Sequence, residues 1–477
     1  MFYIWIDPKK NNLPKVCRFK SFLAGCLLPF LLVLFFIQPA AAKSSQDAFP
    51  IYQPTLEASI SANSAIVIDS GRARRLYAKN ADKHQAIPVA SKVMTALLAC
   101  ERLPLSTQVT ISNVAAMEAQ KEVTGDGLTL EIGDKYPLEY LLLRLVFYDS
   151  NAAALAIAEQ ISNVEEIFVE LMNSKAASLE LADTRFLNST GDPVYENQLP
   201  GQSGSTDLPD NPFEQVPLQY STASDLARLM QYAMSNQNFA NIIRKDSDYL
   251  ILSGNTLVPM QNRIKSIWTL SENRITGACY AERTDRSFGV AVGRVNDFNM
   301  IMVVVDGSPG QRINDMLVLT NAIEDNYVQK PLVTAGEPFT GYQEKTVDGE
   351  TFGLVFKRTV QYVQPINDNF LQPHIQYISY GPHHRPIESS MTVGQVVFEL
   401  KDGTTIAVDI GPDRQILSNI SFLNQLLNNL QSNRNLFYIV LVSGYLLLAA
   451  MAYQLITRII RLFRLVQFVL IERQTRH

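Results

Sequence analysis

The stretch Leu436–Ile456 is the feature that most constrains how this chain of 477 residues can fold, because it holds 21 residues without a charge. A helix that crosses a membrane needs about 20 mostly apolar residues, since its backbone groups must pair within the segment. We therefore predict a transmembrane helix here, and the long chain before it must fold on one side of the membrane.

Basic residues indicate which side that is. Only Arg434 lies close before the stretch, whereas five arginines follow it: Arg458, Arg461, Arg464, Arg473 and Arg476. Basic flanks favour the cytoplasm, so the tail is predicted to be cytoplasmic. Three of these arginines are spaced by three residues among apolar ones, which predicts an amphipathic helix on the inner leaflet.

Residues 1–42 are typical of a secretory signal peptide. Five basic residues precede or border the apolar run Phe22–Ile37, and three alanines at 40–42 form a small-residue cleavage site. We expect this segment to be removed, which leaves a cell-membrane protein with one span and an extracytoplasmic ectodomain.

Charge and cysteine content narrow the class of protein further. The whole chain has a formal net charge of −5 and its first 42 residues carry +4, so the remainder carries −9. An acidic ectodomain argues against nucleic acid as a partner. Cys100 and Cys279 are the two cysteines that remain after cleavage; they could form one bridge, but two buried thiols are expected.

Length and composition predict several parts. The main folded domain is expected at 43–330 and a small β-rich domain at 331–415. The remaining parts are a juxtamembrane linker at 416–435, the transmembrane helix at 436–457 and the basic tail at 458–477.

The segment Ile87–Cys100, IPVASKVMTALLAC, is a predicted helix that pairs a serine with a lysine in an unusual spacing. Residues i and i+3 share one helix face, with Cβ atoms about 5 to 6 Å apart. Val89 holds that position relative to Lys92, while Ser91 is the lysine's immediate neighbour. Adjacent residues point about 100° apart, so Ser91 and Lys92 cannot share a face if both are helical.

The preceding residues predict a hairpin, with strands at Ala65–Asp69 and Arg75–Ala78, that leads into this helix. Hairpin and helix together resemble the D-alanyl-D-alanine carboxypeptidases, the low-molecular-mass serine penicillin-binding proteins. The resemblance extends over about 54–330, and more loosely over 331–420. It implies an α/β (α+β) transpeptidase domain, in which an antiparallel sheet is flanked by helices, followed by a small β domain.

The resemblance also implies three catalytic motifs, and each is altered here. The nucleophile helix of that family opens with Ser-x-x-Lys, whereas this chain has Ser91 next to Lys92. The second motif, Ser-x-Asn, stands before an alanine-rich helix; here Ser150 adjoins Asn151, or Asp149 occupies the serine position. By its residues alone, Asp149 or Ser150 also reads as an ordinary helix N-cap.

The third motif, Lys-Thr-Gly, is implied on a strand where its cation and hydroxyl bind the substrate carboxylate. The candidate is Thr276-Gly277, with Ile275 at the lysine position. Arg274 could supply a charge only if the strand slipped by one residue, and such a slip turns the side chain to the other face.

Other features bear on the ligand. The segment 190–218 contains five acidic residues, Asp192, Glu196, Asp207, Asp210 and Glu214, and no lysine or arginine. A loop this long is typical of a lid or a binding surface, and its charge would repel a carboxylate. His383-His384 lacks a third ligand pattern, so neither a metal nor a cofactor is predicted.

Three functions stay open. The leading hypothesis is a membrane-anchored, catalytically impaired member of the family that binds a peptidoglycan stem peptide, or a wall-synthesis partner, without cleaving it. The alternative is an active carboxypeptidase, able to bind β-lactams, in which Ser91 lies just before the helix and so reaches Lys92. The third is a structural partner of wall-assembly or division proteins that acts through the membrane helix.

Overall fold

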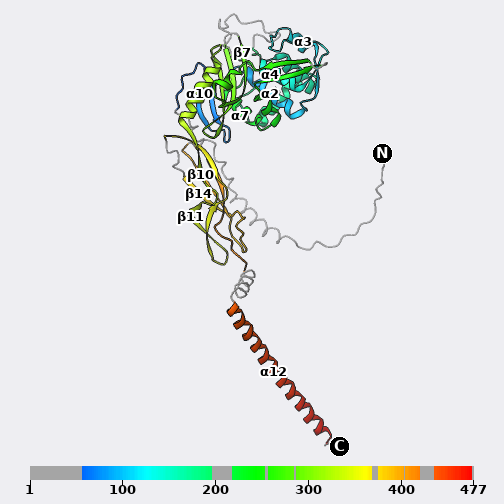
Figure 1. Cartoon of the computed structure of the whole chain (residues 1–477), viewed down its shortest axis with the longest axis vertical. Helices are drawn as coiled ribbons and strands as arrows, with labels where there is room; N and C mark the ends of the chain where they lie inside the picture. The colour runs from blue at the N-terminus through cyan, green and yellow to red at the C-terminus, as the bar shows by residue number, and fades with distance from the viewer. Residues whose placement is uncertain are drawn as a thin grey trace, which may run out of the picture. The chain divides into compact units, whose positions relative to one another are not determined.

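A computed structural model describes residues 56–195, 217–252, 256–283, 286–367, 374–401, 403–418 and 434–474. The predicted signal peptide, most of the acidic segment and most of the juxtamembrane linker lie outside these residues. Figure 1 shows the arrangement of the elements.

A five-stranded antiparallel sheet forms the centre of the first part of the chain, in the order β2-β1-β9-β8-β7. Its strands are β1 (Ser64–Asp69), β2 (Arg75–Lys79), β7 (Ile275–Arg283), β8 (Arg286–Val295) and β9 (Phe298–Gly307). Nearly every residue of β1, β8 and β9 is buried. A central strand covered on both faces reads as a continuous apolar run rather than an alternating one, as Ala65–Ile68 does.

Helices cover both faces of this sheet. Ile66 and Ile68 pack in one core with the first group of helices, whereas Ala65 and Val67 face a second core that contains Met316, Leu319 and Ile323 of α10. Alternate residues of a strand point to opposite faces, so one strand feeds both cores.

The elements of the first group, in chain order, are α2 (Pro88–Arg102), β3 (Gln108–Thr110), α3 (Asn113–Ala119), β4 (Lys135–Pro137), α4 (Leu138–Tyr148), α5 (Asn151–Ser162), α6 (Glu165–Ser178), α7 (Ala223–Ala233) and α8 (Gln237–Ile243). Three further elements follow: the hairpin of β5 (Ser247–Leu252) and β6 (Thr256–Gln261), and the short helix α9 (Ser266–Leu270). Helix α10 (Arg312–Asn326) then follows the central sheet.

The predicted α+β architecture, with an antiparallel sheet between helices, is confirmed. The hairpin of β1 and β2 also forms as expected, and Thr222 caps helix α7. Cys100 and Cys279 are free and buried. Residues Leu128–Ile132 form no strand, and Pro137 is the N-cap residue that precedes α4.

A second, β-rich part follows. Strands β11 (Pro338–Lys345), β12 (Thr351–Phe356), β16 (Thr405–Pro412), β15 (Gly394–Glu399) and β14 (His374–Ser379) form an antiparallel sheet in that order, and β10 (Tyr327–Val333) pairs with β13 (Val360–Pro365). Strands β15 and β16 form a hairpin, with Val396 opposite Val408.

Glu344 is a nearly buried carboxylate in this second sheet. The hydroxyl of Tyr377 donates to its Oε1 at 2.6 Å, and Nε2 of His383 lies 3.6 Å from its Oε2. Burial raises the pKa of Glu344, but hydrogen bonds from Ser379 and Tyr377 and the His383 ring outweigh that effect and hold the pKa below its usual 4.5. The carboxylate form is therefore the form that the folded sheet favours.

We expect the free energy of unfolding to fall as pH drops below about 4.5, because a group with a lowered folded pKa loses its contribution as it takes up a proton. Glu344→Gln should flatten this part of the pH dependence in urea unfolding measured between pH 3 and 6. An unchanged slope in that variant would show that Glu344 does not carry the effect.

The chain ends in α12 (Arg434–Gln474), one continuous helix of 41 residues. Its section Tyr438–Gln467 is long and apolar enough to cross a membrane.

Candidate functional site

Helix α2 begins at Pro88, with Ile87 as its N-cap. Pro suits a first helical position because its missing N–H would have no partner there. Val89, Ser91 and Lys92 are therefore all helical, and all are buried. The alternative of an active enzyme requires Ser91 to lie before the helix, and that arrangement is not present.

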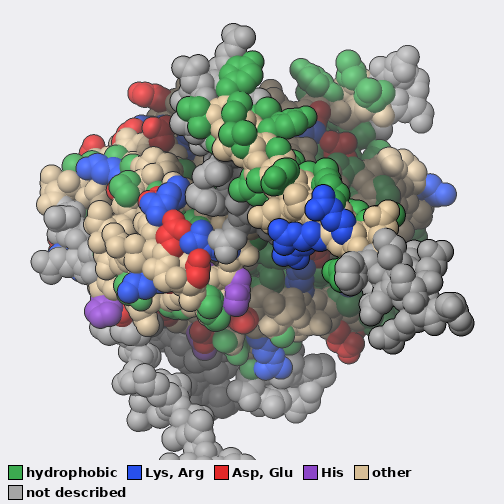
Figure 2. Space-filling model, turned by 90° about the horizontal axis from the view of Figure 1, so that it is seen from below, with side chains coloured by type: hydrophobic (Ala, Val, Ile, Leu, Met, Phe, Trp, Pro, Cys, Tyr) green, Lys and Arg blue, Asp and Glu red, His purple; other side chains and the backbone are tan. Residues whose placement is uncertain are grey.

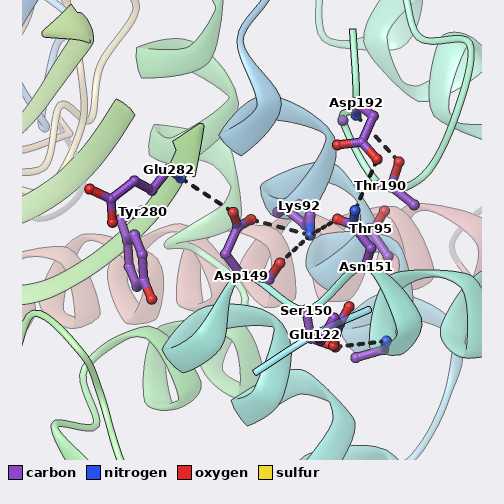
Figure 3. A network of polar contacts seen from close by, with 12 residues as sticks. Lys92, Thr95, Glu122, Asp149, Ser150, Asn151, Thr190, Asp192, Tyr280 and Glu282 are labelled. Carbon is purple, nitrogen blue, oxygen red and sulfur yellow. Dashed lines mark hydrogen bonds and ion pairs between the residues drawn. The ribbon is translucent and has the colours of Figure 1, made fainter. Parts of the chain in front are cut away.

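Lys92 has no exposed side-chain surface and is held from two sides. Its Nζ donates to Oδ1 of Asn151 at 2.6 Å and to the backbone oxygen of Asp149 at 2.8 Å. Oδ1 of the Asp149 carboxylate lies 3.2 Å from the same nitrogen. Figure 3 shows the ammonium group between Asp149 and Asn151. Among the described residues, no hydrogen bond joins Lys92 to a serine hydroxyl.

Asp149 reaches the lysine because it ends α4 in the left-handed conformation, with φ 56°. Aspartate adopts this conformation more readily than most residues do. Its carboxylate, and not the Ser150 hydroxyl, faces Lys92.

Ser150 points the other way, as Figure 3 also shows. Its hydroxyl accepts from the N–H of Ala153 as the N-cap of α5 and donates to Oε2 of Glu122 at 2.7 Å. The second oxygen of Glu122 accepts from the N–H of Ala152 at 2.8 Å. Ser150 and Glu122 thus fix the start of α5, which positions Asn151 toward the lysine.

Two further residues extend the network to the end of β7. The Arg283 guanidinium donates to Oδ2 of Asp149 at 2.8 Å and to Oδ1 of Asp192 at 2.9 Å. Asp192 in turn accepts from the side-chain amide of Asn151 at 2.9 Å. We call Lys92, Asp149, Asn151, Asp192 and Arg283 the lysine network.

The lysine network has two cations and two carboxylates, so it is neutral. Burial lowers the pKa of Arg283, but Asp149 and Asp192 outweigh that effect and raise it above its usual value. Charge-assisted hydrogen bonds of this kind are strong when the groups are taken out of water. The two cations are therefore committed to internal partners.

The network is closed on one side by the loop that carries Asp192. Gly191 has φ +82°, and a Cβ built there would lie 2.3 Å from the backbone oxygen of Pro88. The loop backbone thus packs directly on the first turn of α2. Only glycine combines this conformation with so close an approach.

We expect Gly191→Ala to destabilise the fold by more than the roughly 1–2 kcal/mol that the left-handed conformation alone costs, because the backbone must also move away from Pro88. Gly336→Ala is a matched control, since Gly336 has φ +83° but open space around its Cβ position. Urea unfolding of both variants measures the difference. Equal losses would show that the contact with Pro88 does not matter.

The structure does not bring the predicted third motif to the lysine network. The hydroxyl of Thr276 donates to the backbone oxygen of Val292, Gly277 packs on the backbone of Ile243, and Arg274 pairs with Glu324 on α10. The network meets β7 at Glu282, whose N–H donates to Oδ2 of Asp149 at 3.3 Å, and at Arg283.

The distance along β7 explains this separation. Thr276 and Arg283 are seven residues apart on one strand, which is about 23 Å at 3.3 Å per residue. The sequence match rests on two residues, Thr-Gly, near the start of β7. Contact with Asp149 instead depends on how far the strand extends past α4.

Cys279 lies on the part of β7 nearer to the network. Burial raises the pKa of its thiol to about 12; the Asp149 carboxylate adds to the rise and Lys92 opposes it. A thiol with this pKa stays protonated at neutral pH, and the thiolate is the nucleophilic form. Cys279 therefore does not substitute for the missing serine.

A second ion pair lies beside the network on the same strand. Nη1 of Arg312, at the start of α10, lies 3.0 Å from Oε1 of Glu282. The Arg312 guanidinium also stands over the Tyr280 ring, 4.7 Å from its centre. Glu282 thus holds a third cation near the site in an internal pair.

Sequence reasoning found Lys92, Ser150 and Asn151 but missed Glu122, Asp192 and Arg283 as parts of the site. These three residues come from separate loops and a strand end, and none stands in a short motif. Asp192 had a weak signal, because it belongs to the acidic segment. Arg283 had none, since only the fold brings the end of β7 to Asp149.

The arrangement resembles solved penicillin-binding proteins in fold. Penicillin binding protein 5 from Haemophilus influenzae superposes with a TM-score of 0.54 at 18% identity, over 76% of this chain and 99% of that chain. The peptidoglycan synthesis regulatory factor PBP3 from Streptococcus pneumoniae gives a TM-score of 0.58 at 19% identity, over 75% of this chain and 100% of that chain. The fold is thus that of the penicillin-binding proteins.

A family model described as D-alanyl-D-alanine carboxypeptidase matches residues 51–308, which is more than half of the chain. The chain therefore belongs to the D-alanyl-D-alanine carboxypeptidase family, as the motifs of α2 suggested.

Two curated relatives show how far the likeness extends. D-alanyl-D-alanine carboxypeptidase DacF of Bacillus subtilis (strain 168) is 28% identical over 253 residues, which are 53% of this chain and 56% of that protein. D-alanyl-D-alanine endopeptidase of Escherichia coli (strain K12) is 30% identical over 169 residues, or 35% and 52%. The chain thus spans little more than half the length of these relatives.

Proposed function

We propose that this protein is a membrane-anchored, extracytoplasmic member of the carboxypeptidase family that binds its ligand without cleaving it. One observation carries the proposal: Lys92 is buried between Asp149 and Asn151, while Val89 occupies the position one helical turn before it. A lysine that shares a serine's proton needs the serine on its own face of the helix. Here that face presents a valine.

The expected loss of catalytic rate favours a binding role over a catalytic one. Loss of a serine nucleophile or of its base lowers turnover by about 10⁶ in a well-studied serine protease, and such losses within one unit are not additive. A general base must also come within about 2.6 to 3.2 Å of the proton that it takes. Lys92 instead donates its hydrogen bonds to Asp149 and Asn151.

The same contacts bear on the alternative of an active enzyme that uses Ser91. Ser91 is 1% exposed and lies inside α2, one residue from Lys92. To act, it would have to leave the core and α2 would have to unwind at its first turn. The described structure thus supports the binding role more strongly.

The ligand class follows from the family together with the charges of the site. Members act on peptides that end in D-alanyl-D-alanine, so a peptidoglycan stem peptide or a protein of wall synthesis is the proposed ligand. The cations Lys92, Arg283 and Arg312 are each paired with a carboxylate. A stem-peptide carboxylate would have to displace one of these partners, so we expect weak binding.

Calorimetric titration of the full chain in detergent with a synthetic stem pentapeptide tests the proposal. The same samples are then assayed for released D-alanine. We expect no D-alanine release above a blank. Binding without release of D-alanine supports a stem peptide as the ligand. If the peptide does not bind, the proposed ligand is the protein of wall synthesis. Release that Ser91→Ala abolishes would overturn the proposal.

A further inference from the structure

Three arginines on α12 form a stripe that the described chain does not neutralise. Arg458, Arg461 and Arg464 are exposed and follow one another at three-residue spacing. At 100° per residue they occupy an arc of about 120° on one side of the helix. No ion pair among the described residues involves any of them, and the sequence has no acidic residue between Asp413 and Glu472.

Apolar side chains stand between and beside the arginines of this stripe. Leu462, Phe463 and Leu465 are 66%, 68% and 65% exposed. Figure 2 shows basic side chains standing beside hydrophobic ones on the face in view. This mixture is typical of a helix whose apolar side is buried in lipid while its charges stay at the level of the headgroups.

The length of α12 places the stripe at a definite depth. At 1.5 Å per residue, its 41 residues extend about 60 Å, roughly twice the 30 Å hydrocarbon thickness of a bilayer. The uncharged stretch ends at Ile456, and Arg458 follows two residues later. If that stretch spans the bilayer, the stripe begins where hydrocarbon meets headgroups.

We propose that the arginine stripe binds the phosphate groups of anionic phospholipids; this inference rests on the membrane anchoring proposed above. A guanidinium matches phosphate with two parallel hydrogen bonds. At this depth, lipid phosphate is the counter-charge within reach, and anionic lipids attract basic segments next to a span. An acidic protein surface fits less well, because it would have to cover the leucines and phenylalanine between the arginines.

A contact quenching experiment on the full chain tests the lipid preference. Leu465→Trp places a probe within the arc of the stripe, and Tyr438→Trp places a control probe near the other end of the apolar section. Each variant is reconstituted in phosphatidylcholine vesicles that contain 10 mol% brominated phosphatidylglycerol or, separately, 10 mol% brominated phosphatidylcholine. The signal of the parent chain, from Trp5 and Trp268, is subtracted.

We expect brominated phosphatidylglycerol to quench the probe at position 465 severalfold more than brominated phosphatidylcholine does, and both lipids to quench the probe at position 438 equally. Replacing the three arginines by glutamine should abolish the preference at 465, whereas lysine should keep part of it, since each basic residue near the surface strengthens binding roughly fivefold. Millimolar inorganic phosphate should not compete, because the site requires lipid.

The outcomes separate two failures. Equal quenching of the probe at position 465 by both lipids would overturn the lipid inference but leave the anchor in place. Quenching of neither probe by either lipid would show that α12 does not enter the membrane, which would refute the proposed anchoring itself. Competition by free phosphate would show an anion site that is not specific for lipid and would also overturn the inference.

Discussion

Asp149→Asn is expected to lower the free energy of unfolding by about 3 to 5 kcal/mol, the range found when one partner of a buried ion pair is removed. The substitution keeps the size of the side chain and its tolerance of the left-handed conformation. It leaves Lys92, which has no exposed surface, and Arg283 without the carboxylate that both contact. Urea unfolding of the two chains measures the difference.

Asp297→Asn is a matched control. Asp297 also has a positive φ, 70°, and it also lies near an arginine, but its side chain is 91% exposed. Exposed pairs contribute about 0 to 1 kcal/mol, so this variant should be close to the parent chain. If Asp149→Asn were equally mild, the lysine network would not be the tightly coupled unit described above.

Val89→Ser combined with Asp149→Ser is expected to form a covalent adduct with penicillin at least about a hundredfold faster than Val89→Ser alone. The first change puts a hydroxyl one turn before Lys92, on the lysine's face of the helix. The second removes the carboxylate that lies 3.2 Å from the lysine nitrogen, which frees Lys92 to reach the new hydroxyl, and general-base assistance contributes about 10² to 10⁴. Fluorescent penicillin labelling over time gives both rates.

Two outcomes would contradict this account of the lysine. Equal labelling of the single and double variants would show that Asp149 does not restrain Lys92. Labelling of the double variant at a residue other than the serine introduced at position 89, located by peptide mass spectrometry, would show that the added hydroxyl is not the nucleophile. Because Asp149→Ser also removes a buried charge, both variants need to be checked for folding by circular dichroism.

Much of the fold was predictable because it depends on local patterns. The apolar run at 65–68 and the turn after it specify the hairpin of β1 and β2. Pro88 marks the start of α2, and Thr222 caps α7. Each of these signals lies within a few residues of the element that it determines, so tertiary contacts had little to change.

The candidate site was only partly predictable because most of its contacts join distant parts of the chain. Asp149 could be read as a helix cap or as a motif position, and only the path of α4 turns its carboxylate toward Lys92. For the third motif, the two letters Thr-Gly cannot specify which part of a nine-residue strand faces another helix. Asp192 and Arg283 meet across 91 positions of sequence.

The central claim is that the contacts of Lys92 hold it away from any nucleophile. The most direct test is to measure the intact mass of the native chain after incubation with a saturating β-lactam. The account predicts an unmodified mass, identical in behaviour to that of Ser91→Ala. A mass increase of one opened β-lactam, located on Ser91 and absent from Ser91→Ala, would contradict it and show that the helix opens to bring Ser91 to a base.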